Sequence, residues 1–175
     1  MTHKLEELAA KAVGAVKAAK ATFEGMSGVF RHLVQEHGEA SALLMRLKLT
    51  NDPAYRQELW TQVRAELLAH EEAEMREVYP ALREDPQTAP MVAEHDDDAE
   101  DMRNLIAKMT EIGVESTLWQ TALERLISMV QEHVRDEEEE YFPIADSAFK
   151  DRSDEMLERF EKTKAFAKQN LLSVH

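Results

Sequence analysis

The chain has 175 residues, and its 35 aspartates and glutamates outnumber its 21 lysines and arginines, which gives a net charge of −14. This length fits one domain with a sizeable hydrophobic core. The charge argues against a nucleic-acid partner or an anionic membrane surface, because both require basic side chains. No cysteine is present, so disulfides, zinc–thiolate sites and iron–sulfur clusters are excluded.

The sequence contains no apolar run close to the roughly 20 residues that span a bilayer. Lysines interrupt the apolar stretch of the first residues, MTHKLEELAAKAVGAVKAAK, which therefore does not resemble a secretory signal. A chain without cysteine also fits a reducing compartment. We therefore expect a cytoplasmic protein.

Helix-favouring residues such as alanine, leucine and glutamate dominate the sequence, and few glycines and prolines divide it. Gly25 separates the first expected helix from the second, and Gly113 ends the fourth. Asp52 before Pro53 is typical of an N-cap followed by the first helical residue. The six expected helices cover residues 4–24, 28–49, 53–82, 90–111, 115–147 and 153–172.

Two patterns recur along the chain. An apolar residue, a valine, any residue, a glutamate and a histidine follow one another three times, at residues 33–37, 91–95 and 129–133. A histidine followed by glutamate four residues later and proline ten residues later occurs twice, as His70, Glu74 and Pro80 and as His133, Glu137 and Pro143. This repeat predicts two similar helix pairs. Each pair has a lone histidine on its first helix and His-x-x-x-Glu on its second.

The histidines of these patterns lie on apolar stripes, where residues recur every three or four positions and face the interior of a bundle. The stripe of the third helix is Trp60, Val63, Leu67, His70, Glu74 and Val78. Unpaired charges are costly to bury, and a bound cation would satisfy them together, as in other helix bundles. Imidazole and carboxylate donors suit iron, manganese or zinc. The candidate ligands are His37, His70, Glu74, His95, His133 and Glu137.

Several neighbouring polar residues have simpler interpretations. Three glutamates directly precede candidate ligands and lie about 100° away around the helix, which favours ion pairs over coordination. They are Glu36, Glu94 and Glu132. The acidic run 137–140 is expected on the surface apart from its first member, and His32 is expected to point away from the site. Asp98 is expected on the same face as His95.

These residues together resemble the hemerythrin-like family, also called HHE cation-binding domains. The segments that carry the resemblance are QEHGEASALLMRL, LLAHEEAEMREVYPAL, VAEHDDDAEDMRNL, VQEHVRDEEEEYFPIA and SDEMLERFEKTKAF. The resemblance implies an all-α, up-down four-helix bundle that holds two iron ions joined by an oxo or hydroxo bridge. It implies that successive bundle helices supply His37, then His70 with Glu74, then His95, then His133 with Glu137. Glu74 and Glu137 resemble the bridging carboxylates.

The chain departs from the oxygen-carrying members of this family at two places. Those proteins have a second histidine on the third helix, where this chain has Ala99. They also have a carboxylate five residues after the last histidine, whereas here Glu137 and Glu138 are both acidic. One iron ion would thus lack a usual nitrogen ligand, and Glu71, Asp98 or water could replace it. Glu71 resembles a carboxylate used in iron-sensing members.

The resemblance leaves the N-terminal segment unexplained. We expect residues 1–27 to form a helical extension and residues 28–175 to form the bundle with its C-terminal helix. A weak apolar stripe on the extension could cover the bundle or join protomers into an oligomer. This stripe consists of Leu5, Leu8, Ala12, Ala15 and Ala19.

The preferred hypothesis is a non-haem di-iron protein that binds or reacts with dioxygen, hydrogen peroxide or nitric oxide. Redox chemistry, including that of a di-iron peroxidase or catalase, or sensing is favoured over reversible oxygen carriage. The alternative is an iron or oxygen sensor whose metal occupancy controls fold stability and partner binding without turnover. A ferritin-like store is disfavoured because Glu-x-x-His does not occur. A metal-free scaffold would leave four inward histidines unexplained.

Overall fold

The computed structural model describes the backbone of residues 2–23 and 25–173, and the side chains of residues 9–21, 25–92 and 95–173. Within these ranges the chain is helical and contains no strand. The helices are α1 (Thr2–Phe23), α2 (Gly28–Leu49), α3 (Pro53–Glu77), α4 (Tyr79–Glu84), α5 (Ala89–Ile112), α6 (Thr117–Asp136), α7 (Phe142–Phe149) and α8 (Ser153–Ser173). A π-helical turn, Glu137–Tyr141, joins α6 to α7, and a 3₁₀ turn, Lys150–Arg152, joins α7 to α8.

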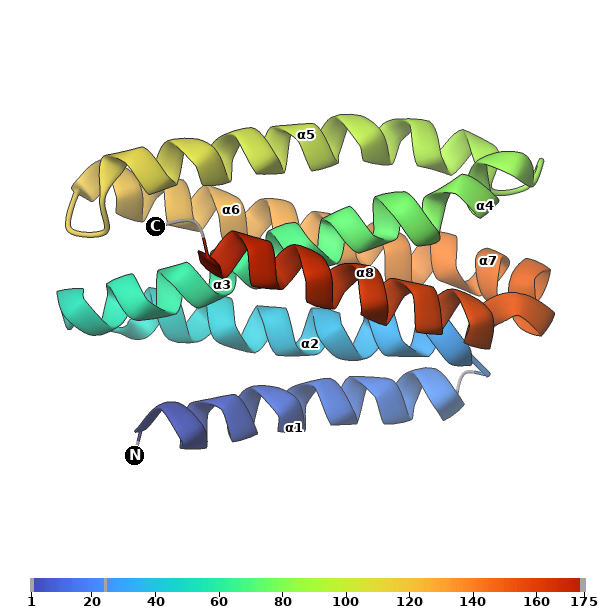
Figure 1. Cartoon of the computed structure of the whole chain (residues 1–175), viewed down its shortest axis with the longest axis horizontal. Coiled ribbons are helices and arrows are strands. Elements are labelled where there is room, and N and C mark those ends of the chain that lie inside the picture. The colour runs from blue at the N-terminus through green and yellow to red at the C-terminus, as the bar shows by residue number, and fades with distance from the viewer. Residues whose placement is uncertain (1, 24, 174–175) are drawn as a thin grey trace.

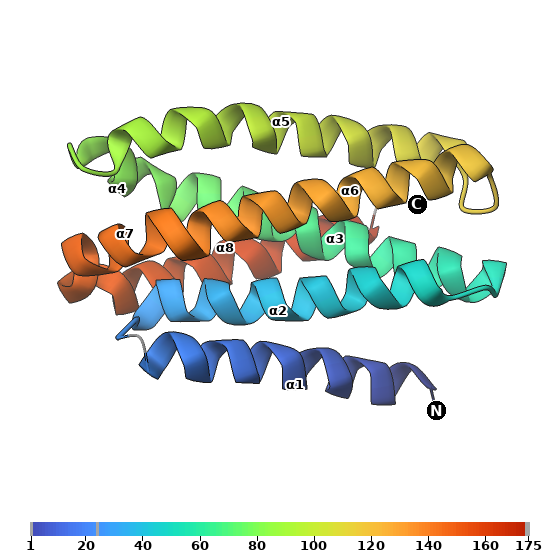
Figure 2. The same cartoon turned by 180° about the vertical axis from the view of Figure 1, so that it is seen from behind.

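Four long helices form the bundle, and two more pack on its outside. Helices α2, α3, α5 and α6 alternate in direction along the chain (Figure 1). Helix α1 lies along the outer side of α2, and α8 packs against α3 and α2 (Figures 1 and 2). The prediction of an all-α, up-down four-helix bundle with an additional N-terminal and C-terminal helix is confirmed. None of the described helices is long and apolar enough to span a membrane.

The helix ends follow the local sequence, with two differences from the prediction. Asp52 caps α3, as expected, because its carboxylate accepts hydrogen bonds from the backbone N–H groups of Ala54 and Tyr55 at 2.9 and 3.2 Å. The third helix was expected to reach residue 82, but α3 ends at Glu77 and α4 begins at Tyr79. Pro80 explains this break, because proline has no N–H group to continue the helical hydrogen bonds.

The fifth expected helix, residues 115–147, is also interrupted. It runs as α6 to Asp136, passes through the π-helical turn and resumes as α7 at Phe142, next to Pro143. The two prolines of the repeat therefore mark two breaks; the first lies a few residues after Glu74, and the second begins at Glu137 itself. Single π turns inside helices often occur at functional sites, because they change which side chains face inward.

The hydrophobic core has two parts, and the candidate ligands lie between them. We call the first the phenylalanine cluster; it contains Phe30, Tyr79, Phe142 and Phe160 among others. We call the second the tryptophan cluster; it contains Trp60, Trp119, Leu126 and Val130 among others. The expected stripe of α3 is buried or half-buried throughout, whereas Asp98, expected on the same face of α5 as His95, is exposed.

Helix α1 turns a different face to the bundle from the predicted one. Ala12, Ala15 and Ala19 are exposed, and Leu5 and Leu8 lie outside the described side chains. The buried residues are Ala10, Gly14, Ala18 and Ala21. A close backbone contact with α2 sets this face, because a Cβ on Gly38 would lie 2.9 Å from the Cα of Gly14. The helix thus packs on the bundle through these small residues, and the described alanines of the predicted stripe do not cover it.

Candidate metal centre

All six predicted ligands converge in the middle of the bundle. His37 comes from α2, His70 and Glu74 from α3, His95 from α5, His133 from α6 and Glu137 from the π-helical turn. Glu74 and Glu137 are 0% exposed, His37 is 3% and His95 is 2% exposed. The side chains of His70 and His133 are 13% and 9% exposed. The helix periodicity that placed these residues on inward stripes therefore predicted their positions correctly.

Glu137 lies among three of the histidines. Its carboxylate oxygens are 3.2 Å from Nε2 of His37 and 3.3 Å from Nε2 of both His95 and His133. Glu74 lies beside the fourth histidine, because its Oε2 is 3.1 Å from Nε2 of His70. Glu137 thus faces histidines of α2, α5 and α6, and Glu74 faces a histidine one turn earlier on its own helix.

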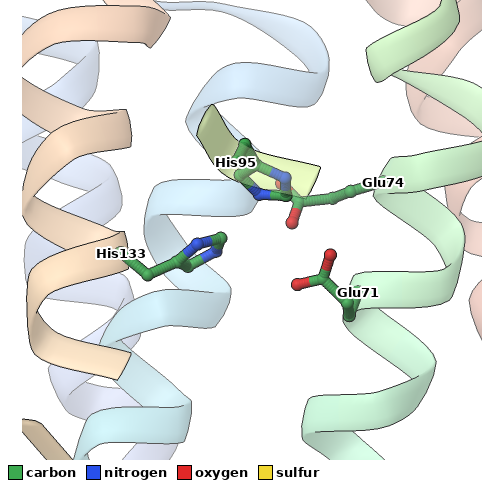
Figure 3. Close-up of side chains that lie close together, drawn as sticks. All are labelled: Glu71, Glu74, His95 and His133. Carbon is green, nitrogen blue, oxygen red and sulfur yellow. The ribbon is translucent and has the colours of Figure 1, made fainter. Parts of the chain in front are cut away.

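The donor atoms form two groups that share Glu74. The first group is His37, His70 and Glu74, and the second is Glu71, Glu74, His95 and His133. Within each group, one ligand atom from each residue lies within 4.8 Å of all the others. Figure 3 shows Glu71 and Glu74 of α3 facing His95 of α5 and His133 of α6. Two groups that share a carboxylate are what two neighbouring cations would require.

The residues fit a bound cation because many of their polar atoms are buried without a hydrogen bond. This holds among the described side chains for both oxygens of Glu71 and Glu74, both ring nitrogens of His95, one oxygen of Glu137, and Nε2 of His37 and His70. Buried polar groups normally have partners, and a cation that accepts all these lone pairs would remove the cost of burying them. Nitrogen and oxygen donors without sulfur suit iron, manganese or zinc.

The carboxyl groups and histidines of the centre shift one another's pKa values. Burial favours the protonated form of Glu137, but His133, His37 and His95 outweigh it and hold the pKa of this carboxyl well below its usual range. Burial disfavours the charged form of His70, yet Glu74 and Glu36 raise its pKa well above the usual value. Protons can therefore occupy these positions when no cation does, and cation binding should release them.

Glu71 differs from the other two carboxyl groups. Burial and the neighbouring Glu74 raise the pKa of Glu71, although His133 and His95 act in the opposite direction. It is 1% exposed, and its nearest cationic side chain, Arg103, is 3.9 Å away. Of the two residues considered, besides water, as substitutes for the histidine missing at Ala99, the structure brings Glu71 to the donor atoms of His95 and His133. Asp98 is exposed and does not join either donor group among the described residues.

Tyr79, a member of the phenylalanine cluster, contacts both Glu137 and His95. Its hydroxyl donates a hydrogen bond to Oε1 of Glu137, and its ring lies 4.0 Å from that of His95. Burial, with Glu137 and Glu74 nearby, raises the pKa of Tyr79 well above its usual value. The phenol therefore stays protonated and serves as a hydrogen-bond donor to Glu137.

Two further glutamates hold histidines from the outer side. Oε1 of Glu138 lies 3.0 Å from Nδ1 of His37, and Oε2 of Glu36 lies 2.7 Å from Nδ1 of His70. This contact of Glu36 fits the expected ion pair, whereas the side chain of Glu94 lies outside the described residues. Glu138 was expected on the surface, but the π-helical turn brings it as well as Glu137 toward His37. Regular helical spacing could not predict this, because it would place adjacent residues on different faces.

A cavity of about 60 Å³ adjoins the histidines. Its walls include Leu43, Leu67, Met102 and Val130, and it extends to Glu66 and Lys164, which are partly exposed. A water molecule needs roughly 10–15 Å³ by this measure, so there is room for a molecule of two or three heavy atoms. A second cavity of about 50 Å³ lies beside His133 and is lined also by Asp98, Met102, Met129 and Glu132.

The fold and the donor groups define a helical bundle with a buried histidine–carboxylate cation site. A family model described as hemerythrin HHE cation binding domain matches residues 28–145, more than half of the chain, and the chain therefore belongs to this family. The match leaves α1 and α8 outside.

A protein of Nostoc sp. (strain PCC 7120 / SAG 25.82 / UTEX 2576) named DNA nickase is 26% identical to the chain over 137 residues. That alignment covers 78% of this chain but 39% of the Nostoc protein, so the chain spans well under half of this relative. No solved structure shows a significant match.

Proposed function

We propose that the chain is a non-haem di-iron protein that binds or reacts with a small oxidant, namely dioxygen, hydrogen peroxide or nitric oxide. The observation that carries this proposal is the pair of donor groups sharing Glu74, next to a cavity of about 60 Å³. Iron would supply the redox chemistry. The chain supplies the ligands, a largely apolar space for a small reactant, and a proton held at Tyr79 next to Glu137.

Peroxide or nitric oxide chemistry, or sensing, is favoured over reversible oxygen carriage. The support comes from the second donor group, where Glu71 lies near His95 and His133 and where the oxygen carriers have another histidine in place of Ala99. Exchanging a neutral nitrogen donor for an anionic oxygen donor stabilises the more highly charged ferric state. Reduced iron should therefore be harder to maintain in this chain, which is unfavourable for a carrier.

A second candidate function is an iron or oxygen sensor without turnover. It is supported by the ion pairs that link α1 and α8 to carboxylates around the centre, since these helices could transmit metal occupancy to a partner. We propose no nucleic-acid partner for this chain. A net charge of −14 is unfavourable for one, and the likeness to the Nostoc protein covers a minor part of that protein.

The proposal is tested on protein produced in iron-rich medium. Elemental analysis should give two iron ions per chain, and Glu74→Ala should lose most of both, whereas His3→Ala should change nothing. After anaerobic reduction and addition of oxygen, the visible spectrum should show oxidation in a single pass, and the ferric protein should consume peroxide. A stable oxygen adduct that releases oxygen repeatedly under vacuum would favour carriage instead. A folded protein with no bound metal would overturn the proposal.

A further inference from the structure

The two donor groups are supported differently from outside the centre. In the first group, each histidine offers its outer nitrogen, Nδ1, to a glutamate: His37 to Glu138 at 3.0 Å and His70 to Glu36 at 2.7 Å. In the second group, among the described side chains, no glutamate or aspartate accepts a hydrogen bond from Nδ1 of His95. His133 likewise has its close carboxylate contact at Nε2, with Glu137.

Each supporting glutamate is held in turn by a lysine from a helix outside the matched segment. Lys17 of α1 donates to Oε1 of Glu138 at 2.6 Å, the same oxygen that faces His37. Lys164 of α8 lies 2.7 Å from Oε2 of Glu36, the same oxygen that faces His70. The lysine and glutamate side chains are 31% and 19% exposed in the first relay, and 16% and 13% in the second.

The contact between α1 and α2 is built so that Lys17 can reach Glu138. Gly38, the residue after His37, faces Gly14, and a Cβ on Gly38 would lie 2.9 Å from both the Gly14 Cα and the Lys17 Cδ. A Cβ on Gly14 would lie 2.6 Å from the backbone oxygen of Gln35. Any side chain at either glycine would therefore move α1, and with it Lys17, away from the bundle.

We propose that Lys17 and Lys164 are positioning residues for the first donor group, so that a cation held by His37 and His70 is retained while one held by His95 and His133 exchanges. A carboxylate on the outer nitrogen of a ligand histidine fixes the ring and its tautomer and makes the inner nitrogen a better donor. The lysines hold those carboxylates in place against the histidine rings. The inference rests on the proposed metal centre, but not on iron or on any reaction with an oxidant.

Zinc release from the full chain tests this inference, because Zn²⁺ has no redox chemistry and suits the same donors. Zinc-loaded protein is mixed with an excess of a chromogenic chelator, and the release of zinc is followed with time. Wild-type protein should release one ion quickly and one slowly. Lys17→Met and Lys164→Met should each accelerate the slow phase about tenfold or more, the usual scale for losing such support, and leave the fast phase within twofold.

The matched control is Lys168→Met, which removes a lysine one turn further along α8. Lys168 pairs with Glu66, which also pairs with Lys164 but forms no hydrogen bond or ion pair with a candidate ligand histidine among the described side chains. In Lys168→Met, both release phases should stay within twofold of wild type.

Gly38→Ala should reproduce the effect of Lys17→Met on the slow phase. Combining Lys17→Met with Glu138→Gln should give little more than either change alone, because the two changes break the same relay.

A spectroscopic measurement separates positioning from general loosening of the fold. Long-range nitrogen–proton spectra of the zinc-loaded chain should show His37 and His70 protonated at Nδ1, and Glu36→Gln should change the signal of His70 but leave that of His95 unchanged. Equal acceleration of both phases, or of neither, would overturn the inference. If zinc behaves as expected but the iron form ignores oxidants, the inference stands and the proposed function fails. A chain that binds no zinc or iron would overturn both.

Discussion

The two ends of the bundle surround the metal centre in different ways. At the end of the phenylalanine cluster, the ring of Phe142 stacks on His37 at 5.8 Å with an angle of 18°, and Tyr79 packs on His95. Both of these aromatic residues are 0% exposed. At the end of the tryptophan cluster, Leu67 and Val130 border the cavity of about 60 Å³. One end thus fixes the ligand rings, and the other leaves space beside them.

This difference shows how one bundle can combine rigidity with access. Aromatic rings packed against the imidazoles limit the rotation of the imidazole rings. A set of ligands needs this restriction in order to hold its geometry. A cavity costs stability, because the side chains that line it lose packing partners. Its position next to the donor atoms, and not elsewhere in the core, is what a small reactant would require. Four changes should sharpen or abolish the contrast.

Removing the metal should have the largest effect, because both donor groups lie between the two ends. Without cations, buried Glu74 depends on the neighbouring histidine, and buried Glu137 depends on its histidines and the hydroxyl of Tyr79. An uncompensated buried charge costs on the order of 3–5 kcal/mol. The unfolding free energy should fall by several kcal/mol, and roughly 2–4 °C of melting temperature is lost per kcal/mol in a chain of this size. Melting of holo and chelator-treated protein, followed by circular dichroism, measures this. Equal melting temperatures would contradict it.

Truncating the packed end should cost more than truncating the cavity end. Phe142→Ala removes a fully buried ring and should lower the unfolding free energy by about 3–5 kcal/mol. Val130→Ala removes less apolar volume beside an existing cavity and should cost about 1.5–2 kcal/mol. Urea denaturation of both variants, loaded with the same metal, gives the two values. Similar costs at the two positions would mean that the ends are packed equally well.

Much of this contrast follows from residues that the sequence identifies, and the exceptions have physical causes. His37, His70, His95 and His133 could be placed by periodicity alone, because a regular helix fixes which residues share a face. Asp98 shows the limit of the same rule. It lies on the expected face of α5 near His95, but the helix carries it to the surface, and Glu71 of α3 lies at the donor atoms instead.

The irregular backbone explains a second exception. Glu138 faces His37 because five residues form a π-helical turn, and hydrophobic periodicity assumes that no such turn exists. The face of α1 differs from the predicted one for a different reason. Apolar residues predict one face, but a close contact between Gly14 and Gly38 decides which face lies against α2, and glycines carry no hydrophobic signal. Pro80 and Pro143 are part of the repeat, but the predicted helices run through both of them, whereas the structure interrupts each helix next to the proline.

Filling the cavity should slow the reaction with oxidant without removing metal. Val130→Phe places a ring into the cavity of about 60 Å³ and should slow peroxide consumption or dioxygen oxidation about tenfold, which corresponds to about 1.4 kcal/mol of activation free energy. Stopped-flow absorbance of the iron-loaded variant measures the rate. The matched control is Leu123→Phe, two turns earlier on the same face of α6 and not part of the cavity wall, with a similar overpacking cost. An unchanged rate in Val130→Phe would show that the oxidant approaches from elsewhere, for example past Asp98.

The smallest effect is expected at the outer limit of the cavity, where Glu66 faces two lysines of α8. Burial favours its protonated form, but Lys164 at 3.2 Å and Lys168 outweigh it and lower the pKa of Glu66 below its usual value. A carboxyl group with a lowered pKa in the folded state stabilises that state above its unfolded pKa, and this contribution disappears as the pH falls through the folded value. The contribution should be under about 1 kcal/mol, because the side chain is 25% exposed and water screens the pair.

Glu66→Gln should therefore lower the unfolding free energy slightly at pH 7 and converge with wild type as the pH falls below the usual glutamate range. Denaturant titrations at pH 7 and at the lowest pH where both chains stay folded measure the difference. A gap that persists or grows on acidification would mean that Glu66 acts through packing and not through its charge, and the cavity would then be bordered by a structural contact instead of an ion pair.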